Sequence, residues 1–313
     1  MSAVVVALLP NAGLGNKLFV WAKAQLFAHL NNLPLQTVGW TYPKIGPILR
    51  GERSTRMYGR LFDTSPGRAL LSLGQGYLRS RLIHEPSCTT PAEIDPKAVY
   101  LFRKLPHWSN AFGDVRDHRE LIRARLQSIV RKECVAELDE AESPVVAIHV
   151  RRGDFRVLEP DEDFRQVGGV RTPDAYFAGI VHGLRTAAGF EVPVTVFSDG
   201  SDAELSCLLR LPAVARARPL NDISALLLMS RAQVIAISAG STYGEWAAYL
   251  SNAIVLRHPH HIHAPIRPTC PNGRLYEGPS PETNAGWQDL WRHTIAPRLS
   301  GEHSALPRGS RPR

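Results

Sequence analysis

The amino-acid sequence predicts an α/β protein in which helices cover parallel sheets. From residue 145 onward, short apolar segments typical of buried strands alternate with segments of helical periodicity, a pattern that specifies repeated β-α-β units. The chain also opens with an apolar segment, a glycine-containing loop and a helix with one apolar face. Right-handed crossovers between such units give a doubly wound sheet.

The opening unit comprises a predicted strand at 4–9, a turn-rich loop and a helix from about Lys17. The loop contains Gly13, Gly15 and Asn16, and it precedes a helix N-terminus that can face a phosphate or a sugar. The glycines do not complete a G-x-G-x-x-G pattern, so a tight turn without a ligand explains them equally well. The apolar face of the helix carries Leu18, Ala22, Leu26 and Leu30.

The middle of the chain separates two expected domains. The stretch 39–106 has no clear period and is rich in Pro, Gly and Arg, which predicts loops with short helices. A helix is expected over 117–138, before a break at Ala-Glu-Ser-Pro. For 313 residues, two domains are expected. We place an N-terminal domain at 1–142, a C-terminal domain at 143–300 and a disordered tail at 301–313.

The central strand of the C-terminal domain is predicted at 145–150 and is followed by Arg151 and Arg152, then by a glycine and Asp154. Two guanidiniums at the end of a buried strand need charged partners, and their planar donor groups suit phosphate oxygens. His149, within the strand, adds a further donor. This strand end is predicted to bind an anion, and the alternative is an internal ion pair with Asp154.

Polar residues also follow the next two predicted strands, at 194–197 and 233–237. The first ends on Ser198 and Asp199, and the second leads through Ser241 and Thr242 into a helix. Because the carboxyl ends of parallel strands share one edge of the sheet, these residues are expected to converge with the arginines. Free N–H groups and hydroxyls at the helix start can meet a phosphate, although a plain helix cap is the alternative.

Three other groups of side chains are not expected to form sites. The acidic segment 161–163 is predicted to be a solvated loop rather than a metal site. Four histidines between 258 and 263 are expected on a surface loop, with a zinc site as the alternative. The four cysteines are widely spaced, as expected for reduced thiols in a cytoplasmic protein.

Composition limits the class of partner. The net charge of +8 favours an anionic partner, but the basic residues are scattered with few aromatics among them, so no nucleic acid is expected. A sugar nucleotide fits this charge, as does an acidic membrane surface. No apolar run reaches the length of a membrane span, and the N-terminus lacks the form of a signal peptide. The expected location is the cytoplasm, including peripheral association with the inner membrane surface.

Four segments, in this order, resemble motifs of the α1,2-fucosyltransferase family, which shares a superfamily with α1,6- and protein O-fucosyltransferases. They are Gly-Leu-Gly-Asn-Lys-Leu-Phe at 13–19, His-Val-Arg-Arg-Gly-Asp at 149–154, Phe-Ser-Asp at 197–199, and Ile-Ser at 237–238 leading to Trp-Ala-Ala-Tyr-Leu at 246–250. The second segment is the most specific. The resemblance implies a GT-B fold, in which two Rossmann-like domains face each other across a cleft.

The resemblance also implies a reaction. GDP-fucose would be the donor, an oligosaccharide the acceptor, and fucose would be transferred with inversion, as an α1,2 linkage to galactose, with no required cofactor or metal. Arg151 would hold the donor β-phosphate with support from Arg152. The other donor-binding residues implied by position are His149 and Asp199 at the guanosine, Ser198 beside them, Ser241 and Thr242 at the pyrophosphate, and Gly13 and Gly15 facing the fucose.

The implied catalytic residues are Arg151, Asn16 and Asp154. Asn16 would face the fucose across the cleft. Asp154 is the nearest carboxylate in sequence that could take the proton of the acceptor hydroxyl, unless it only orients Arg151. The donor is expected on the C-terminal domain and the acceptor against the N-terminal one, where Trp40 and Tyr42 are either stacking partners for a sugar or core residues.

The chain departs from the family at two places. Gly200 stands where an acidic residue is usual, and the segment 239–246 differs from the Asn-Ser-Ser-Phe-Ser-Trp-Trp pattern. Two alternatives therefore accompany the fucosyltransferase hypothesis. One is a transferase that uses another GDP-sugar, and the other is a non-catalytic nucleotide- or nucleic-acid-binding α/β protein.

Overall fold

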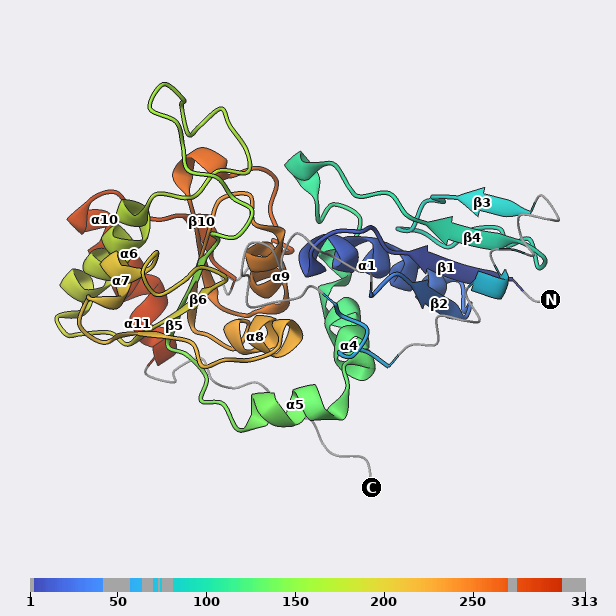
Figure 1. The fold of residues 1–313 in the computed structure, drawn as a ribbon, viewed down its shortest axis with the longest axis horizontal. Helices are drawn as coiled ribbons and strands as arrows, with labels where there is room; N and C mark the ends of the chain where they lie inside the picture. Colours follow the sequence, from blue (N-terminus) through green and yellow to red (C-terminus); the bar gives the residue numbers. More distant parts are fainter. Residues whose placement is uncertain are drawn as a thin grey trace.

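The computed structural model describes residues 3–41, 57–63, 70–72, 74, 81–269 and 275–299. Two parallel β-sheets with their helices lie side by side along the long axis of the molecule (Figure 1). The predicted α/β class with two parallel sheets is confirmed. The segment 301–313, for which a disordered tail was expected, lies outside the described residues.

Among the described residues, the first sheet has four parallel strands in the order β2-β1-β4-β3. β1 (Val4–Leu8) lies between β2 (Leu35–Val38) and β4 (Val99–Phe102), and β3 (Leu82–His84) forms an edge. β3 and β4 correct the expectation of loops and short helices for 39–106. Each has only three or four residues and is stabilised by pairing with a distant segment, so no local periodicity marks it.

Helix α1 (Leu14–Leu30) connects β1 to β2 and is buried along most of its length. It packs against β1, β4, α4 (Arg119–Ile129) and α9 (Thr242–Leu250), so it has neighbours on several sides. The helix begins three residues earlier than predicted, because Gly13 takes the N-cap position and the next residues form the first turn.

The second sheet has six parallel strands within the described residues, in the order β10-β9-β8-β5-β6-β7. β5 (Val146–Val150) is central and buried at every residue. Its neighbours are β6 (Val194–Ser198) and β8 (Val234–Ile237). The outer strands are β7 (Val214–Arg216), β9 (Ile254–Arg257) and β10 (Glu277–Pro279). Because the pairing is parallel throughout, the carboxyl ends of all these strands lie along one edge.

Helices cover both faces of the second sheet (Figure 1). One face packs against α6 (Asp174–Ala188), α7 (Ser206–Leu209), α10 (Asn284–Leu290) and α11 (Ala296–Leu299). The other face packs against α8 (Asp222–Met229) and α9. Successive residues of β5 alternate between the two cores, as the pleat of a strand requires.

The helix predicted over 117–138 is two helices. α4 ends at Ile129, and α5 (Lys132–Asp139) follows after a break at Val130. Val130 has extended backbone (φ −71°, ψ 132°) and pairs with Phe62, which interrupts the helix. Two short 3-10 turns, η1 (Trp108–Asn110) and η2 (Arg116–His118), precede α4. Helix α5 packs against α8, so the link between the sheets contacts the second one.

The two sheets share a hydrophobic core through α1 and α9. The ring of Phe112 lies 4.8 Å from that of Phe19 on α1 and 4.8 Å from that of Tyr249 on α9. Phe19 also lies 5.2 Å from Trp246, again on α9. These rings belong to one continuous cluster of buried side chains. The shared core therefore fixes the position of α1 relative to α9.

Candidate functional site

Arg151 stands directly after β5, at the carboxyl edge of the second sheet. Its guanidinium pairs with Asp199 through Nη1 and with Asp154 through Nη2, and its backbone N–H donates to Ser238 Oγ at 2.8 Å. The internal ion pair with Asp154 is thus present. A guanidinium has five N–H groups, and the contacts recorded among the described residues use two of them. The others, on a side chain that is 19% exposed, are available to an anion.

Arg152 is buried, and its Nη1 donates to the carbonyl of Arg151 at 3.3 Å. Its guanidinium pairs with Asp174 at the start of α6 and donates to the carbonyl of Thr172 at 3.4 Å. Its backbone N–H donates to Asp199 Oδ1 at 2.8 Å. Arg152 therefore joins the strand end to α6, and its contacts position the turn that presents Arg151.

Asp199 is shared by both arginines, since Oδ2 faces the Arg151 guanidinium and Oδ1 accepts the Arg152 N–H. Glycines allow this close approach. A Cβ on Gly153 would collide with Asp199 Oδ2, and a Cβ on Gly200 would lie 2.7 Å from Arg152 Cγ. The glycine at position 200 thus has a packing reason. A contact of Asp199 with guanosine stays a prediction.

Two buried hydroxyls fix the loops at this edge. Ser238 Oγ accepts from the Arg151 N–H and donates to the His149 carbonyl at 3.0 Å. Thr172 Oγ1 accepts from the Ala239 N–H at 2.9 Å. Thr172 lies next to a proline, a pattern typical of a helix cap, but α6 begins only at Asp174 and the threonine bonds to another loop. Ser198, half-buried at the end of β6, accepts from the N–H of Gly200 at 3.0 Å.

The His149 ring lies beneath α9. Its centroid is 5.4 Å from that of the Tyr243 ring, and a Cβ on Gly244 would lie 2.8 Å from His149 Nδ1. Nδ1 is buried without a hydrogen-bond partner among the described residues. Burial, assisted by the charge of Arg151, lowers the pKa of His149 to about 3, so the ring is neutral at neutral pH. A guanosine contact of this ring stays a prediction.

The N-terminus of α9 follows β8 at the same edge. Gly240 has φ +67°, a conformation that favours glycine, and it turns the chain from the strand into the helix. Ser241 is buried at the N-cap position but its side chain makes no capping hydrogen bond. This observation disfavours the plain helix cap as the role of Ser241. The N–H groups of the first turn and the positive end of the helix dipole remain available to an anion.

The N-termini of α1 and α9 meet. A Cβ on Gly15 would lie 2.6 Å from Thr242 Oγ1 and 2.8 Å from the backbone nitrogen of Tyr243. The structure thus brings the predicted glycine loop of the first sheet to the predicted helix start of the second. Asn16 is half-buried beside this contact, and no hydrogen bond of its amide is recorded within the described part of the chain.

Two buried side chains hold the glycine loop in place. The Tyr58 hydroxyl accepts from the Leu14 N–H at 3.1 Å. Lys17, fully buried, donates from Nζ to the carbonyl of Pro10 at 2.8 Å and to that of Gly39. These carbonyls follow β1 and β2, so one lysine ties together two strand ends. Nothing in the local sequence distinguishes Lys17 from a surface lysine.

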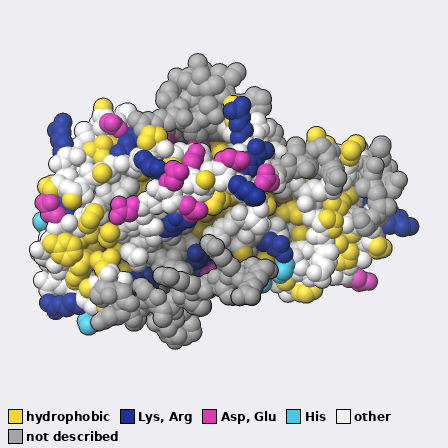
Figure 2. All heavy atoms as spheres, turned by 90° about the horizontal axis from the view of Figure 1, so that it is seen from below, with side chains coloured by type: hydrophobic (Ala, Val, Ile, Leu, Met, Phe, Trp, Pro, Cys, Tyr) yellow, Lys and Arg dark blue, Asp and Glu magenta, His cyan; other side chains and the backbone are white. Residues whose placement is uncertain are grey.

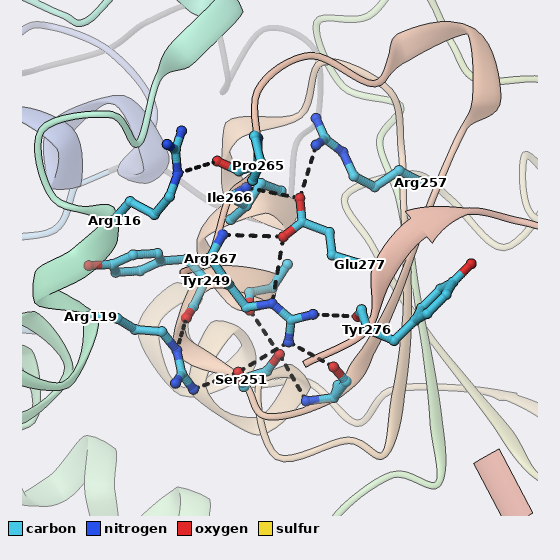
Figure 3. Close-up of polar contacts among 12 residues, drawn as sticks. Arg116, Arg119, Tyr249, Ser251, Arg257, Pro265, Ile266, Arg267, Tyr276 and Glu277 are labelled. Carbon is cyan, nitrogen blue, oxygen red and sulfur yellow. Dashed lines mark hydrogen bonds and ion pairs between the residues drawn. The ribbon is translucent and has the colours of Figure 1, made fainter. Parts of the chain in front are cut away.

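A second set of polar contacts joins the halves at the C-terminus of α9 (Figure 3). Arg119 of α4 donates from Nε to the carbonyl of Tyr249 and from Nη2 to that of Ser251, both at 2.6 Å. The Tyr249 hydroxyl donates to the Val115 carbonyl at 2.7 Å. A buried guanidinium thus satisfies carbonyls at the negative end of the helix, and it comes from the other half of the chain.

The segment after β9 is fixed by buried charges in the same region (Figure 3). Glu277 accepts from Arg257 Nη1 at 3.0 Å and from the backbone N–H of Arg267 at 3.2 Å. Arg267 Nη1 donates to the Ala253 carbonyl at 2.7 Å, and burial lowers the pKa of Arg267 to about 10. Arg116 Nε donates to the Pro265 carbonyl at 2.7 Å, which attaches this segment to the first half.

The remaining groups show no metal centre. Glu162, in the acidic loop, pairs with Arg156, and Asp163 pairs with Arg165 at 3.0 Å. The described residues contain no group of three or more His, Cys, Asp or Glu side chains that could hold a metal ion. The cysteines that the structure describes are free, namely Cys88, Cys134 and Cys207, and Cys270 lies outside the described residues.

The surface gives two further findings. None of the described helices has the length and hydropathy needed to cross a membrane. Figure 2 shows one face of the molecule, on which basic and acidic side chains are interspersed.

Trp40 is a core residue. It is 3% exposed and stacks on Phe62 with ring centroids 4.0 Å apart. Of the two interpretations of Trp40, core packing is the one observed. Tyr42 lies outside the described residues.

Comparison with known proteins finds no matching family model and no matching curated protein. Among solved structures, fucosyltransferase NodZ from Bradyrhizobium is similar over 80% of this chain and 93% of its own, with 12% identity and a TM-score of 0.48. POFUT1 in complex with GDP is similar over 82% and 98%, with 13% identity and a TM-score of 0.44. Arabidopsis thaliana FUT1 in complex with GDP is similar over 82% and 70%, with 12% identity and a TM-score of 0.41.

Proposed function

We propose that the protein is an inverting glycosyltransferase that moves fucose from GDP-fucose to a hydroxyl of a glycan acceptor. The observation that carries this proposal is that the N-termini of α1 and α9 meet at the carboxyl edge of the second sheet, the edge at which Arg151 also stands. Ligands of open α/β sheets bind at these edges. The order of the four motif segments supports the choice of GDP-fucose.

Transfer from a nucleotide sugar needs positive charge at the leaving diphosphate. Arg151 offers free N–H groups on a fixed guanidinium, and α9 offers N–H groups without a side-chain cap. Such preorganised donors stabilise charge that develops in the transition state. We therefore assign the pyrophosphate to Arg151, Ser241 and Thr242, with Arg152 and Asp199 as positioning residues and no metal required.

His149 is proposed to act through α9. The neutral imidazole ring lies against Tyr243 and Gly244, which belong to the first turn of α9. The size of the ring therefore sets how closely α9 approaches β5. Tyr243 is fixed in turn by a hydrogen bond from its hydroxyl to the Asp222 carbonyl at 2.6 Å. The imidazole thereby positions the N–H groups that face the pyrophosphate.

In the reaction, the acceptor oxygen attacks the anomeric carbon of fucose from the face opposite the diphosphate. The bond from that carbon to the β-phosphate oxygen breaks, and its electron pair remains on GDP. The hydroxyl proton goes to a general base, for which we propose Asp154, the more exposed of the two carboxylates that pair with Arg151, with 44% of its side chain exposed. Asn16 and Gly13 are proposed to face the fucose from the first sheet, and the acceptor is proposed to be galactose, linked α1,2.

A transfer assay tests this function. The purified protein is incubated with GDP-fucose and galactose-terminated oligosaccharides, with and without EDTA, and the products are analysed by mass spectrometry and NMR. We expect an α1,2-fucosylated product at an unchanged rate in EDTA. Loss of activity in EDTA that Mn²⁺ restores would contradict the metal-free site.

The same assay separates the alternatives. Transfer from another GDP-sugar, with none from GDP-fucose, would identify a transferase of different donor specificity. Binding of GDP without hydrolysis or transfer of any GDP-sugar would identify a non-catalytic nucleotide-binding protein. Absence of GDP binding would contradict the proposed site altogether.

A further inference from the structure

Trp108 is an exposed tryptophan held in a fixed position. It is 68% exposed, whereas Trp21 and Trp40 of the same half are buried. Its ring lies 4.6 Å from that of His263, edge to face, and 5.4 Å from that of His107. Exposing so large an apolar side chain to water does not stabilise the fold. The ring contacts with the two histidines nevertheless hold the indole in place.

Trp108 and His263 lie at the same edges as the proposed donor site. η1, which begins at Trp108, follows β4 of the first sheet, and His263 follows β9 of the second. All strands of each sheet are parallel, so these residues come after carboxyl ends, as the glycine loop and Arg151 do. In Figure 1, η1 lies at the end of the first sheet that faces the second one.

Hydrogen bonds make this place a third connection between the two sheets. The Ser109 carbonyl accepts from the Ala264 N–H at 3.1 Å, and Arg116 donates to the Pro265 carbonyl at 2.7 Å. Phe112, four residues after Trp108, packs against α1 and α9 through its ring contacts. The indole is therefore joined by rigid elements to the two helices whose N-termini form the proposed donor site.

The chemistry of this surface fits a neutral sugar. A pyranose presents C–H groups on its ring faces and hydroxyls around its rim, which suits an aromatic ring flanked by imidazoles. Burial and the nearby charge of Arg257 lower the pKa of His263, so its imidazole is neutral at neutral pH and can donate or accept one hydrogen bond at each nitrogen.

We propose that Trp108 and His263 form the acceptor subsite, with the indole stacked on a pyranose ring and the imidazole hydrogen-bonded to a sugar hydroxyl. This inference rests on the proposed function and deepens it, because it names the residues that hold the acceptor. The stacking role that the sequence suggested for Trp40, which is buried, is thereby assigned to Trp108, an accessible tryptophan of the same half.

The test measures acceptor binding separately from donor chemistry. Binding of lactose and of N-acetyllactosamine is measured by saturation-transfer NMR and calorimetry in the presence of GDP, for the wild type, Trp108→Ala, Trp108→Phe and Phe190→Ala. Phe190 is a matched control because it is 55% exposed and has a ring contact with Trp291 on the second half. GDP affinity and hydrolysis of GDP-fucose are measured in the same variants.

We expect Trp108→Ala to weaken sugar binding about tenfold, from the loss of roughly 1–1.5 kcal/mol of stacking. Trp108→Phe should retain most of the affinity, and Phe190→Ala should equal the wild type. GDP affinity and donor hydrolysis should not change in any variant. His263→Gln should raise the acceptor KM with kcat nearly unchanged.

Unaltered sugar binding in Trp108→Ala would overturn the subsite, as would an equal loss in Phe190→Ala. If the wild type hydrolyses GDP-fucose but binds neither sugar, the subsite fails while the donor half of the proposed function stands. If no variant binds GDP, the proposed function itself fails. A change of oligomeric state in Trp108→Ala, without change in sugar binding, would show that the indole contacts a second copy instead.

Discussion

At the scale of single residues, the Asp199 carboxylate determines how the two arginines are used. One oxygen faces the Arg151 guanidinium and the other accepts the N–H of Arg152. Because both oxygens are engaged, Asp199 cannot turn toward either arginine without losing the other. The pair Arg151 and Asp199 is therefore set before any anion binds, which is the condition under which electrostatic stabilisation is effective.

Arg151→Ala tests the phosphate contact. We expect transfer to fall by about 10²–10³-fold, equivalent to about 3–4 kcal/mol, because the side chain that neutralises the leaving group is removed. Arg156→Ala is the matched control, since Arg156 is an exposed arginine that pairs with Glu162 in the loop after the site. Steady-state kinetics measure both, and circular dichroism checks the fold. Activity of Arg151→Ala within about threefold of the wild type would exclude it as the main phosphate ligand.

His149 predicts a pH dependence of stability. Its pKa is about 3 in the folded protein and 6.5 as the ordinary value, so between these pH values the unfolded chain binds a proton that the folded protein does not. The free energy of unfolding should therefore increase as pH rises from about 3 to 6.5 and decrease as pH falls through the same range. The contribution of His149 to this slope is at most about 1.4 kcal/mol per pH unit.

The measurement is urea unfolding between pH 4 and pH 7 for the wild type and His149→Gln. The variant should show a smaller loss of stability on acidification. His293→Gln, which changes an exposed histidine, should keep the slope of the wild type. His258, whose pKa burial lowers to about 4, adds to the slope in all three proteins, so the difference between them reports on His149. Equal slopes would contradict a neutral buried ring.

At the scale of elements, α9 is the helix on which the site depends. Its N-terminus lies against α1 through Gly15, and its rings pack into the core that both sheets share. Its C-terminus receives the guanidinium of Arg119. A helix of nine residues is thus held at both ends by the other half of the chain.

Gly15→Ala should separate the two helix N-termini. The new methyl group would lie 2.6 Å from Thr242 Oγ1 and 2.7 Å from the Thr242 carbonyl carbon, so backbone must shift. We expect a loss of about 1–3 kcal/mol in stability, as for overpacked cores, with weaker GDP binding. Thermal unfolding and calorimetry measure the two effects.

Gly13→Ala is the matched control in the same loop. A Cβ at Gly13 meets nothing within 4 Å, and its φ of −64° suits alanine. Because alanine is a poorer N-cap than glycine, its stability should fall by about 0.5–1 kcal/mol, less than in Gly15→Ala. Similar losses of stability in both variants would mean that the glycines maintain the conformation of the loop rather than the contact between α1 and α9.

The sequence predicts long and strongly patterned elements well, and it misses what distant contacts decide. The strand β5 and the arginines after it follow from local pattern, because a buried apolar run ending in charge is visible in the chain itself. β3 and β4 are too short to show a period and exist through pairing with β1 and with each other. The break of α4 at Val130 depends on its pairing with Phe62, which lies far away in sequence.

The candidate site divides in the same way. Arg151, Asp199 and the start of α9 follow strands, and topology alone predicts their convergence. The partners of Arg152, Ser238 and Lys17 could not be predicted, because their hydrogen bonds join loops that only the folded sheet brings together. Trp40 and Trp108 show the same limit, since composition does not reveal which tryptophan is buried.

At the scale of the whole molecule, the two sheets are joined as one unit. Contacts at the N-terminus of α9, at its C-terminus and beside Trp108 connect them at three separate places. Arg119 is the most deeply involved residue, with bonds to Tyr249, Ser251 and Asn252 while it is itself buried. Rotation of one sheet against the other would break these three bonds of a buried guanidinium, while its ion pair with Glu120 on the same helix would remain.

Arg119→Ala should therefore weaken the connection between the sheets. We expect a loss of about 3 kcal/mol, because buried carbonyls lose charged donors, and a broader unfolding transition in urea. Arg123→Ala, on the same helix, removes a half-exposed arginine that pairs with Glu120 at 3.9 Å and should change stability by less than about 0.5 kcal/mol. Tryptophan fluorescence and far-UV circular dichroism measure the urea unfolding of both variants. Equal effects in both variants would contradict the proposed role of Arg119.

Because Arg119 of α4 caps α9, the first half of the chain cannot complete its folding until α9 has been synthesised. The first half leaves the ribosome with Phe19, Phe112 and Arg119 lacking partners that lie in α9 and directly after it. The second sheet has one face closed by its own helices α6, α7, α10 and α11. The first half therefore finishes folding on a helix that is made later, and a nascent chain shorter than about 250 residues keeps an open apolar surface.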